Sequence, residues 1–249
     1  MNDISLSALL LILLTFFVAG GVKGVTGMGL PTVAMGMLGA LISPLAAASL
    51  LIVPSFVTNL WQLLAGPAFR PVLRRLWPMT LAICAGTVPG AAWIAGGDAE
   101  AARVLLGSAL ILYASYSLLT RQLSVPARIE PVLSPIIGGV TGLVSGATGV
   151  FVIPAVPYLQ ALGLSKDDLV QALGLSFTVS TVALAAALGA NGAFSVEMMG
   201  LSLLSLAPAL IGMWAGQKLR NRISLVTFRR LFLGFLLLLG TEMALRPWH

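Results

Sequence analysis

The sequence predicts an all-α polytopic membrane protein, and three observations support this fold class. Of the 249 residues, 58% are hydrophobic and only 9% are charged, whereas soluble domains carry about 25% charged residues. The mean hydropathy of +1.01 leaves too few polar side chains to cover a water-exposed surface. The apolar residues form long runs, and a helix needs about 20 such residues to cross a bilayer. We therefore expect about 8–10 helical segments in a membrane.

Apolar runs follow one another along the whole chain. They cover residues 4–22, 23–42, 44–65, 76–95, 101–120, 132–163, 169–190, 196–216 and 227–245. The run 132–163 is too long for one span and too short for two. Its internal Gly146, Gly149, Pro154 and Pro157 suggest two short helices, broken or re-entrant.

The basic residues indicate the orientation of the chain. Eleven of the 14 Lys and Arg residues fall in four predicted loops: Arg70, Arg74, Arg75, Arg121, Arg128, Lys166, Lys218, Arg220, Arg222, Arg229 and Arg230. Basic loops favour the cytoplasmic side. All four loops can share that side only if residues 132–163 enter and leave the membrane there. By the same logic, residues 4–42 enter and leave on the outer side. This topology predicts a multi-pass protein of a bacterial inner membrane with its N-terminus outside.

The two halves of the sequence resemble each other. Residues 20–24 (GGVKG) match residues 138–142 (GGVTG), which aligns Lys23 with Thr141, and Ser55-Phe56 matches Ser176-Phe177. Each half then holds a short or broken helix pair plus three spanning helices. Because the number of crossings is odd, the halves run in opposite directions. We predict two inverted repeats, residues 1–122 and 132–249, joined by a cytoplasmic linker at 123–131. Inverted repeats are typical of secondary transporters, which bind substrate near the midplane between the repeats.

The same residues carry a resemblance to a known family. The Gly-rich opening of each half, the downstream prolines and the two-half layout resemble the sulfite exporter TauE/SafE family, also called the toluenesulfonate uptake permeases. The resemblance covers essentially the whole chain. It implies transport of sulfite, organosulfonates or related sulfur anions across the bacterial inner membrane. The family often has three glycines before the proline, whereas this chain has Gly27-Met28-Gly29 and Ala147-Thr148-Gly149.

Glycines inside the apolar runs predict breaks in two helices. Gly27, Gly29, Gly146 and Gly149 could unwind the chain, and Pro31 and Pro154 could restart a helix, since proline suits the first helical position. A helix N-terminus offers free N–H donors and a partial positive charge, so it attracts anions. The alternative is that these glycines only let neighbouring helices approach closely.

Lys23 is the one cation that is assigned neither to a predicted loop nor to the C-terminal tail. A charge at the centre of a bilayer costs at least about 2.5 kcal/mol, so a buried one usually has a function. Its alignment with Thr141 places Lys23 about ten residues into its segment, hence near mid-depth. Three roles follow: a counter-charge for an anionic substrate, a side chain that reaches the headgroups, or a contact between helices.

Uncharged polar side chains complete the predicted substrate site. Thr26, Ser145 and Thr148 could donate hydroxyl hydrogen bonds to an oxyanion, or bond their own helix backbone instead. Asn59 and Gln62 need hydrogen-bond partners in lipid. Ser176 and Thr178 are the corresponding polar residues of the second half and could share an inward face with Asn59. A hydrogen bond between helices is the alternative for each of them.

These features favour a secondary transporter over the other function classes. An intramembrane hydrolase lacks a base, because the single histidine is the last residue, His249. A passive anion channel is a closer alternative, since Gly-rich loops can line a pore. We predict transport of a small anion, a sulfur oxyanion or alternatively a carboxylate, by alternating access at a midplane site. The expected partners are the anion, the lipid bilayer, a coupling proton or sodium ion and a second copy of the chain, with no nucleic acid, cofactor or metal.

Overall fold

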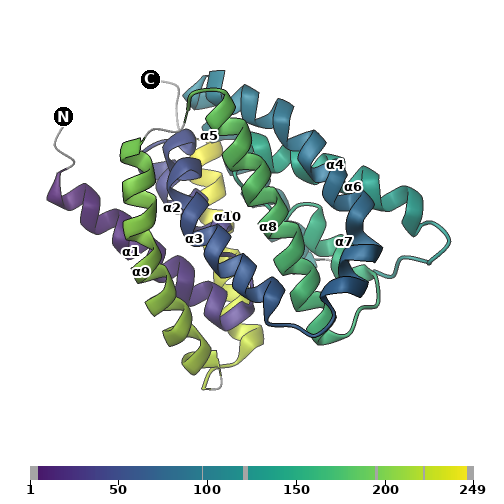
Figure 1. The fold of residues 1–249 in the computed structure, drawn as a ribbon. Coiled ribbons are helices and arrows are strands. Elements are labelled where there is room, and N and C mark those ends of the chain that lie inside the picture. Colours follow the sequence, from purple (N-terminus) through teal and green to yellow (C-terminus); the bar gives the residue numbers. More distant parts are fainter. Residues whose placement is uncertain (1–4, 97, 120–122, 194–195, 221, 246–249) are drawn as a thin grey trace.

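The chain folds into a bundle of helices. The computed structural model describes residues 5–96, 98–119, 123–193, 196–220 and 222–245. Within these ranges there are ten helices and no strand (Figure 1). They are α1 (Leu6–Thr26), α2 (Leu30–Leu41), α3 (Pro44–Leu64), α4 (Phe69–Gly96), α5 (Ala99–Leu119), α6 (Glu130–Thr148), α7 (Ala155–Ala161), α8 (Lys166–Ala190), α9 (Val196–Arg220) and α10 (Leu225–Leu245).

The helix lengths confirm the polytopic all-α prediction. Seven helices in the described ranges are long and apolar enough to cross a membrane: α1, α3, α4, α5, α6, α8 and α9. Helix α10 has a similar length of 21 residues. Helix α2 has 12 residues and α7 only 7. At about 1.5 Å per residue, neither can cross a hydrocarbon core of about 30 Å. Each is a short helix that follows a helix of spanning length.

Several helix boundaries differ from the sequence prediction. Helix α1 continues through Lys23 to Thr26, four residues beyond the end of the first apolar run at residue 22. Most basic residues assigned to loops lie in helices instead: Arg70, Arg74, Arg75, Lys166, Lys218, Arg220, Arg229 and Arg230. The physical reason is that a helix can continue beyond the apolar run when its charged side chains reach the headgroups or water. Arg121 and His249 lie outside the described residues.

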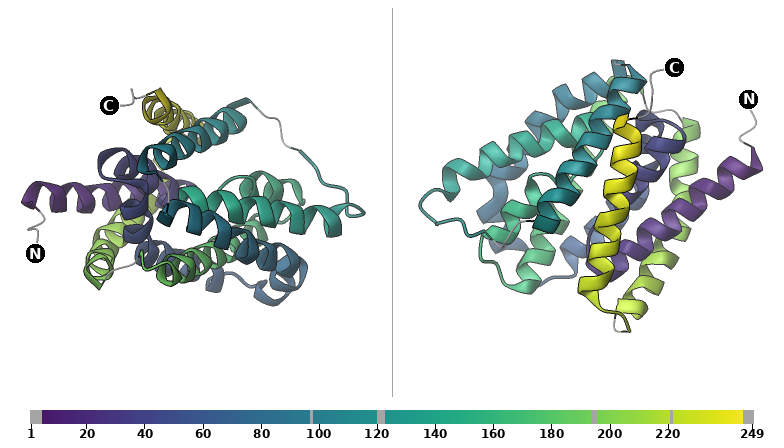
Figure 2. Two further views of the ribbon diagram at one scale, coloured as in Figure 1. Left: turned by 90° about the horizontal axis from the view of Figure 1, so that it is seen from above. Right: turned by 180° about the vertical axis from the view of Figure 1, so that it is seen from behind.

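Close pairs of helices form the bundle. Helix α1 packs against α9, and α4 packs against α6, while α5 lies against α10 (Figures 1 and 2). Glycines on the facing sides bring the first two pairs together: Gly20 and Gly24 with Gly212 and Gly216, and Gly142 and Gly146 with Gly86 and Gly90. Small residues of this kind let helix backbones approach closely in lipid. Helices α3 and α8 pack on each other and are the most buried of the spanning helices.

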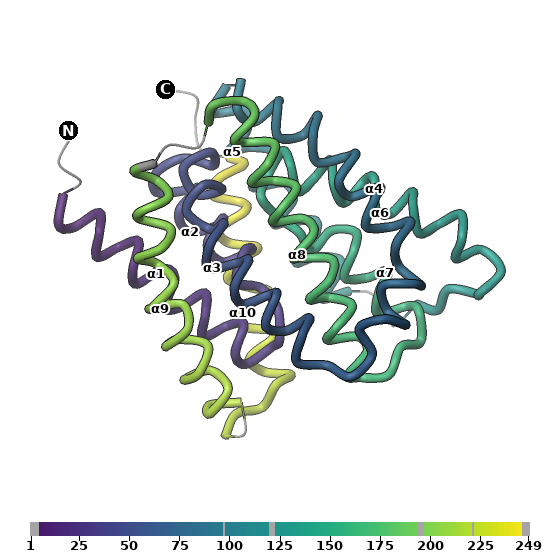
Figure 3. Tube along the Cα trace, in the orientation of Figure 1, coloured from purple at the N-terminus to yellow at the C-terminus, as the bar shows by residue number. Residues whose placement is uncertain are grey.

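Sequence signals explain where the two central helices begin. Ser43 accepts a hydrogen bond from the Ala46 amide at 3.2 Å at the start of α3. Ser165 accepts one from the Asp168 amide at 3.2 Å at the start of α8. Each serine satisfies an amide that has no partner within its helix. The tube in Figure 3 shows both helices running through the middle of the bundle.

A proline inside α3 creates a contact with α9. Pro54 has no N–H, so the Leu50 carbonyl lacks its usual partner in the helix. The buried Ser202 hydroxyl of α9 donates to that carbonyl at 2.8 Å. The same hydroxyl accepts a hydrogen bond from the Val53 amide at 3.1 Å. Ser202 thus replaces the missing helix hydrogen bond and ties α3 to α9.

We expect Ser202→Ala to destabilise the bundle by about 1–2 kcal/mol, because it leaves the buried Leu50 carbonyl without a donor. Unfolding by a denaturing detergent in mixed micelles measures this change. Ser205→Ala is a matched control on the same helix. The Ser205 side chain is equally buried, but it donates only to its own helix at the Leu201 carbonyl. Equal stability of the two variants would contradict the assignment of Ser202 to the break in α3.

Candidate functional site

Helix α1 ends in a threonine–glycine turn. Gly27 has a φ of 81°, in the left-handed region that glycine adopts without strain. Its N–H donates to the Lys23 carbonyl at 2.7 Å. The Thr26 hydroxyl donates to the Val22 carbonyl at 2.9 Å and accepts a hydrogen bond from the Met28 amide at 3.2 Å. The predicted break at Gly27 is confirmed, and the Thr26 hydroxyl serves to close it.

Helix α6 ends in the same way, 122 residues later. Gly149 has a φ of 67°, and its N–H donates to the Ser145 carbonyl at 2.8 Å. The Thr148 hydroxyl donates to the Val144 carbonyl at 2.7 Å and accepts from the Val150 amide at 3.2 Å. These matching ends pair Lys23 with Ser145. The sequence alignment paired Lys23 with Thr141, and the structural correspondence replaces that pairing.

The short helices begin after these turns. Gly29, with a φ of 98°, precedes α2, and Pro31 is the second residue of that helix, one position later than predicted. Pro154 stands just before α7, so it flanks the helix start rather than occupying the first helical position. The predicted break at Gly146 is wrong, because α6 continues to Thr148. A side chain at Gly146 would meet the backbone of α4, so close packing explains this glycine.

Lys23 is buried between α1 and α3. Its side chain is 4% exposed. The ammonium group donates to the Thr58 hydroxyl at 3.2 Å and to the Asn59 side-chain oxygen. Both acceptors are neutral, so the positive charge is hydrogen-bonded but not compensated by them. An ammonium group has three donors, and these two acceptors leave one N–H for a ligand.

A chain of hydrogen bonds continues from Lys23 to α8. The Asn59 amide donates to the Ser55 hydroxyl at 2.9 Å, and Ser55 lies 3.0 Å from the Thr181 hydroxyl. Thr181 donates to the Phe177 carbonyl at 2.7 Å. Its proton is therefore used, and Ser55 must be the donor in the Ser55–Thr181 pair. All the donors point away from Lys23, so the chain directs its acceptor oxygens toward the cation.

The structure brings only some of the predicted site residues together. Lys23 and Asn59 are in contact, as the prediction of a shared polar site requires. Ser145 and Thr178 donate to their own helices, at 3.0 Å to Gly142 and 2.7 Å to Gly174. Ser176 is 2% exposed, and its hydroxyl has no hydrogen-bond partner among the described residues. Gln62 finds its partner on α8, where it donates to the Val170 carbonyl at 2.9 Å.

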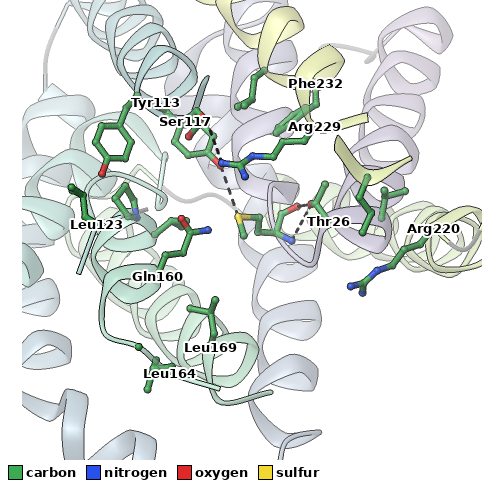
Figure 4. A pocket seen from close by; sticks show the side chains of 18 residues that line it. Thr26, Tyr113, Ser117, Leu123, Gln160, Leu164, Leu169, Arg220, Arg229 and Phe232 are labelled. Atoms are coloured by element: carbon green, nitrogen blue, oxygen red, sulfur yellow. Dashed lines mark hydrogen bonds between the residues drawn. The ribbon is translucent and has the colours of Figure 1, made fainter. Parts of the chain in front are cut away.

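A cavity of about 490 Å³ lies beside the turn that ends α1. Its walls come from α1, α5, α7, α8, α9 and α10, so both halves of the chain contribute. Polar and charged side chains line part of it: Thr26, Tyr113, Tyr116, Ser117, Gln160, Arg220 and Arg229 (Figure 4). Lys23 lies three residues before Thr26, about 4.5 Å along the helix axis. The cavity thus approaches the buried cation from the end of the bundle that carries Arg220 and Arg229.

Sequence reasoning missed the residues of this cavity. From the sequence, Arg220 and Arg229 indicate only the cytoplasmic side. Gln160 and Tyr113 received no role, although polar side chains in apolar runs require partners. Tyr113 is 6% exposed, and its hydroxyl contacts the Met28 sulfur at 3.8 Å. Such residues could have been selected by their polarity, but only the fold shows that four different helices direct them to one space.

Comparison with known proteins identifies the family. The family model described as "Sulfite exporter TauE/SafE" matches residues 12–243. No curated protein and no solved structure matches the chain. The family match extends from α1 to α10 and includes both threonine–glycine turns, Lys23 and the cavity. It confirms the resemblance that the sequence motifs indicated. This chain belongs to the sulfite exporter TauE/SafE family, whose members are membrane transporters of sulfur-containing anions.

Proposed function

We propose that this protein carries a sulfur oxyanion, sulfite or an organosulfonate, across a bacterial inner membrane by alternating access. The bound anion sits near the midplane, with Lys23 as its counter-charge. We propose that Thr26, Gly27, Gly29, Asn59, Ser145, Thr148, Gly149, Ser176 and Thr178 contact the anion during the transport cycle. The cycle is that of a secondary transporter, in which a proton or sodium gradient can supply the driving force.

The single observation that carries this proposal is the environment of Lys23. An ammonium group in a lipid-embedded helix pair normally pairs with a carboxylate or reaches water. Here Lys23 is 4% exposed, and its ammonium group is held by a hydroxyl and an amide oxygen, both neutral. An anion that binds its remaining N–H would neutralise the charge in a low-dielectric setting, where such a contact is strong.

The packing pattern supports the two inverted repeats of this proposal. When α1–α5 are matched in order with α6–α10, the pair α1–α9 corresponds to α6–α4, and the pair α3–α9 corresponds to α8–α4. The pairs α3–α8 and α5–α10 map onto themselves. Both repeats also contain a threonine–glycine turn before their short helix. We assign residues 1–122 and 132–249 to the repeats and 123–131 to the linker, with the N-terminus outside.

Transport assays in liposomes test the function directly. Purified protein is reconstituted, and the fluxes of sulfite, benzenesulfonate and acetate are measured with and without imposed proton or sodium gradients. We expect saturable flux of the sulfur anions, with uphill accumulation when the coupling gradient is present. Flux that is only downhill and does not saturate would establish a channel instead. Faster flux of acetate than of either sulfur anion would overturn the proposed substrate class.

A further inference from the structure

The wall of the cavity changes from polar and accessible to apolar and buried along two helices. On α10, exposed Arg229 is followed one turn later by Phe232 and Leu233, which are 8% and 2% exposed. On α7, buried Val156 is followed one turn later by half-buried Gln160. The cavity therefore has a charged, accessible mouth and an apolar, buried floor.

The mouth presents a cation that the protein does not neutralise. The Arg229 guanidinium donates from Nη2 to the Ser117 carbonyl at 3.3 Å. A guanidinium has five N–H donors, so several remain for a ligand, and among the described residues Arg229 has no carboxylate partner. Arg229 and Gln160 extend into the same space from different helices, and Arg220 lies at its margin (Figure 4).

The size of the cavity distinguishes between kinds of anion. Its volume of about 490 Å³ lies within the range of sites that hold organic ligands. A bare inorganic oxyanion would occupy a small part of this space and leave the floor of Val156, Phe232 and Leu233 without contact. An anion with an apolar body would cover that floor, and each buried CH₂ equivalent contributes about a fourfold gain in affinity.

We propose that this cavity is a cytoplasm-side binding site, separate from Lys23, for an organic anion with an apolar body. Arg229 and Gln160 bind the anionic group at the mouth, and Phe232 and Leu233 contact the organic part. The proposal rests on the proposed transport function, because the site lies one helical turn from the Lys23 layer. A substrate bound in this cavity would lie about one helical turn from the buried cation.

Calorimetric titration of the purified protein in detergent tests the site without measuring transport. The probes are benzenesulfonate, sulfite and the neutral benzenesulfonamide. We expect benzenesulfonate to bind most tightly and Arg229→Gln to weaken it roughly tenfold, because a charge-assisted hydrogen bond is lost. Arg230→Gln is the matched control, since Arg230 is the exposed neighbour that does not line the cavity. Equal affinity in both variants, or equally tight binding of sulfite, overturns the proposal.

Thiol labelling locates the bound ligand. Cys84 is the only cysteine, so a Cys84→Ser background allows single cysteines to be introduced. We expect Gln160→Cys to react with a sulfonate-bearing thiol reagent from the cytoplasmic side, and benzenesulfonate to protect it. Arg74→Cys, at an exposed position on α4, should react without protection. Labelling of Gln160→Cys that benzenesulfonate does not slow would overturn the site.

The two proposals fail in different ways. Lys23→Met should lose transport while it still binds benzenesulfonate at the cavity. If sulfur-anion flux is intact but Arg229→Gln leaves benzenesulfonate affinity unchanged, the cavity proposal fails and the transport proposal stands. If benzenesulfonate binds and protects as expected but no sulfur anion crosses the membrane, the transport function is wrong and the binding site remains.

Discussion

Lys23→Met should reduce sulfur-anion flux in liposomes roughly 10- to 100-fold, because it removes the charge that we propose binds the anion, and hydrogen bonds to charged groups contribute about 1.5–3 kcal/mol. Methionine keeps the length and flexibility of lysine, so it fills the same space between α1 and α3. It also removes the cost of burying an ammonium group in the membrane. We therefore expect the variant to fold, and to unfold at a denaturant concentration at least as high as that of the parent protein.

Two further variants make the Lys23 experiment specific. Lys166→Met removes a cation from the exposed start of α8 and should leave the flux unchanged. Asn59→Asp places a carboxylate on the side chain that already contacts the ammonium group. This internal counter-ion should compete with the substrate and lower the flux while the helix contact is retained. Full activity of Lys23→Met would eliminate Lys23 as the counter-charge and leave the contact between α1 and α3 as its role.

Gly142→Ala should disrupt the pairing of α4 with α6 and lower the stability of the protein by about 3 kcal/mol. An added Cβ at this position would lie 2.9 Å from both the Ile83 carbonyl carbon and the Thr87 amide nitrogen. These are backbone atoms, so no side-chain rotation relieves the overlap and the helices must separate. Detergent-induced unfolding and the amount of folded protein after purification measure the effect.

The same helix provides the control for Gly142. A Cβ at Gly139 meets nothing within 4 Å. Gly139→Ala should therefore be neutral or stabilise the helix by up to about 1 kcal/mol, because alanine is the better helix former. If Gly139→Ala and Gly142→Ala behave alike, the glycines matter for flexibility and not for the close approach of α4 and α6.

The sequence predicted most of the spans, because apolar length alone determines whether a helix can cross a membrane. Residues 132–163 are the exception: they hold one helix of spanning length and one short helix, not the two short helices expected. It also identified the turn at Gly27, where a threonine–glycine pair combines a capping hydroxyl with a residue that tolerates positive φ. Gly146 shows the limit of this reasoning. The sequence shows the same residue type whether a glycine ends a helix or contacts a neighbouring helix. Only the position of α4 shows that Gly146 has the second role.

The candidate site was predicted in part. Burial of Lys23 and its proximity to Asn59 follow from the cost of a charge and an amide in lipid. Their link through Ser55 to Thr181 depends on how α3 and α8 pack, and no local pattern specifies that. The repeat alignment erred for a related reason. Gly-rich segments of the two halves can be aligned at several offsets, whereas the matching hydrogen bonds of Thr26 and Thr148 fix a single offset between the halves.

The presence of a buried ammonium group in only one half has an electrical consequence. The corresponding position in the second half is Ser145, so the charge is not duplicated. In an alternating cycle, a monoanion bound to protonated Lys23 forms a complex with no net charge there, and its crossing is insensitive to voltage. The return of the empty carrier moves the cation alone. A membrane potential of 100 mV changes the energy of a full elementary charge that crosses the membrane by about 2.3 kcal/mol. The potential would therefore change the rate at which the empty carrier returns.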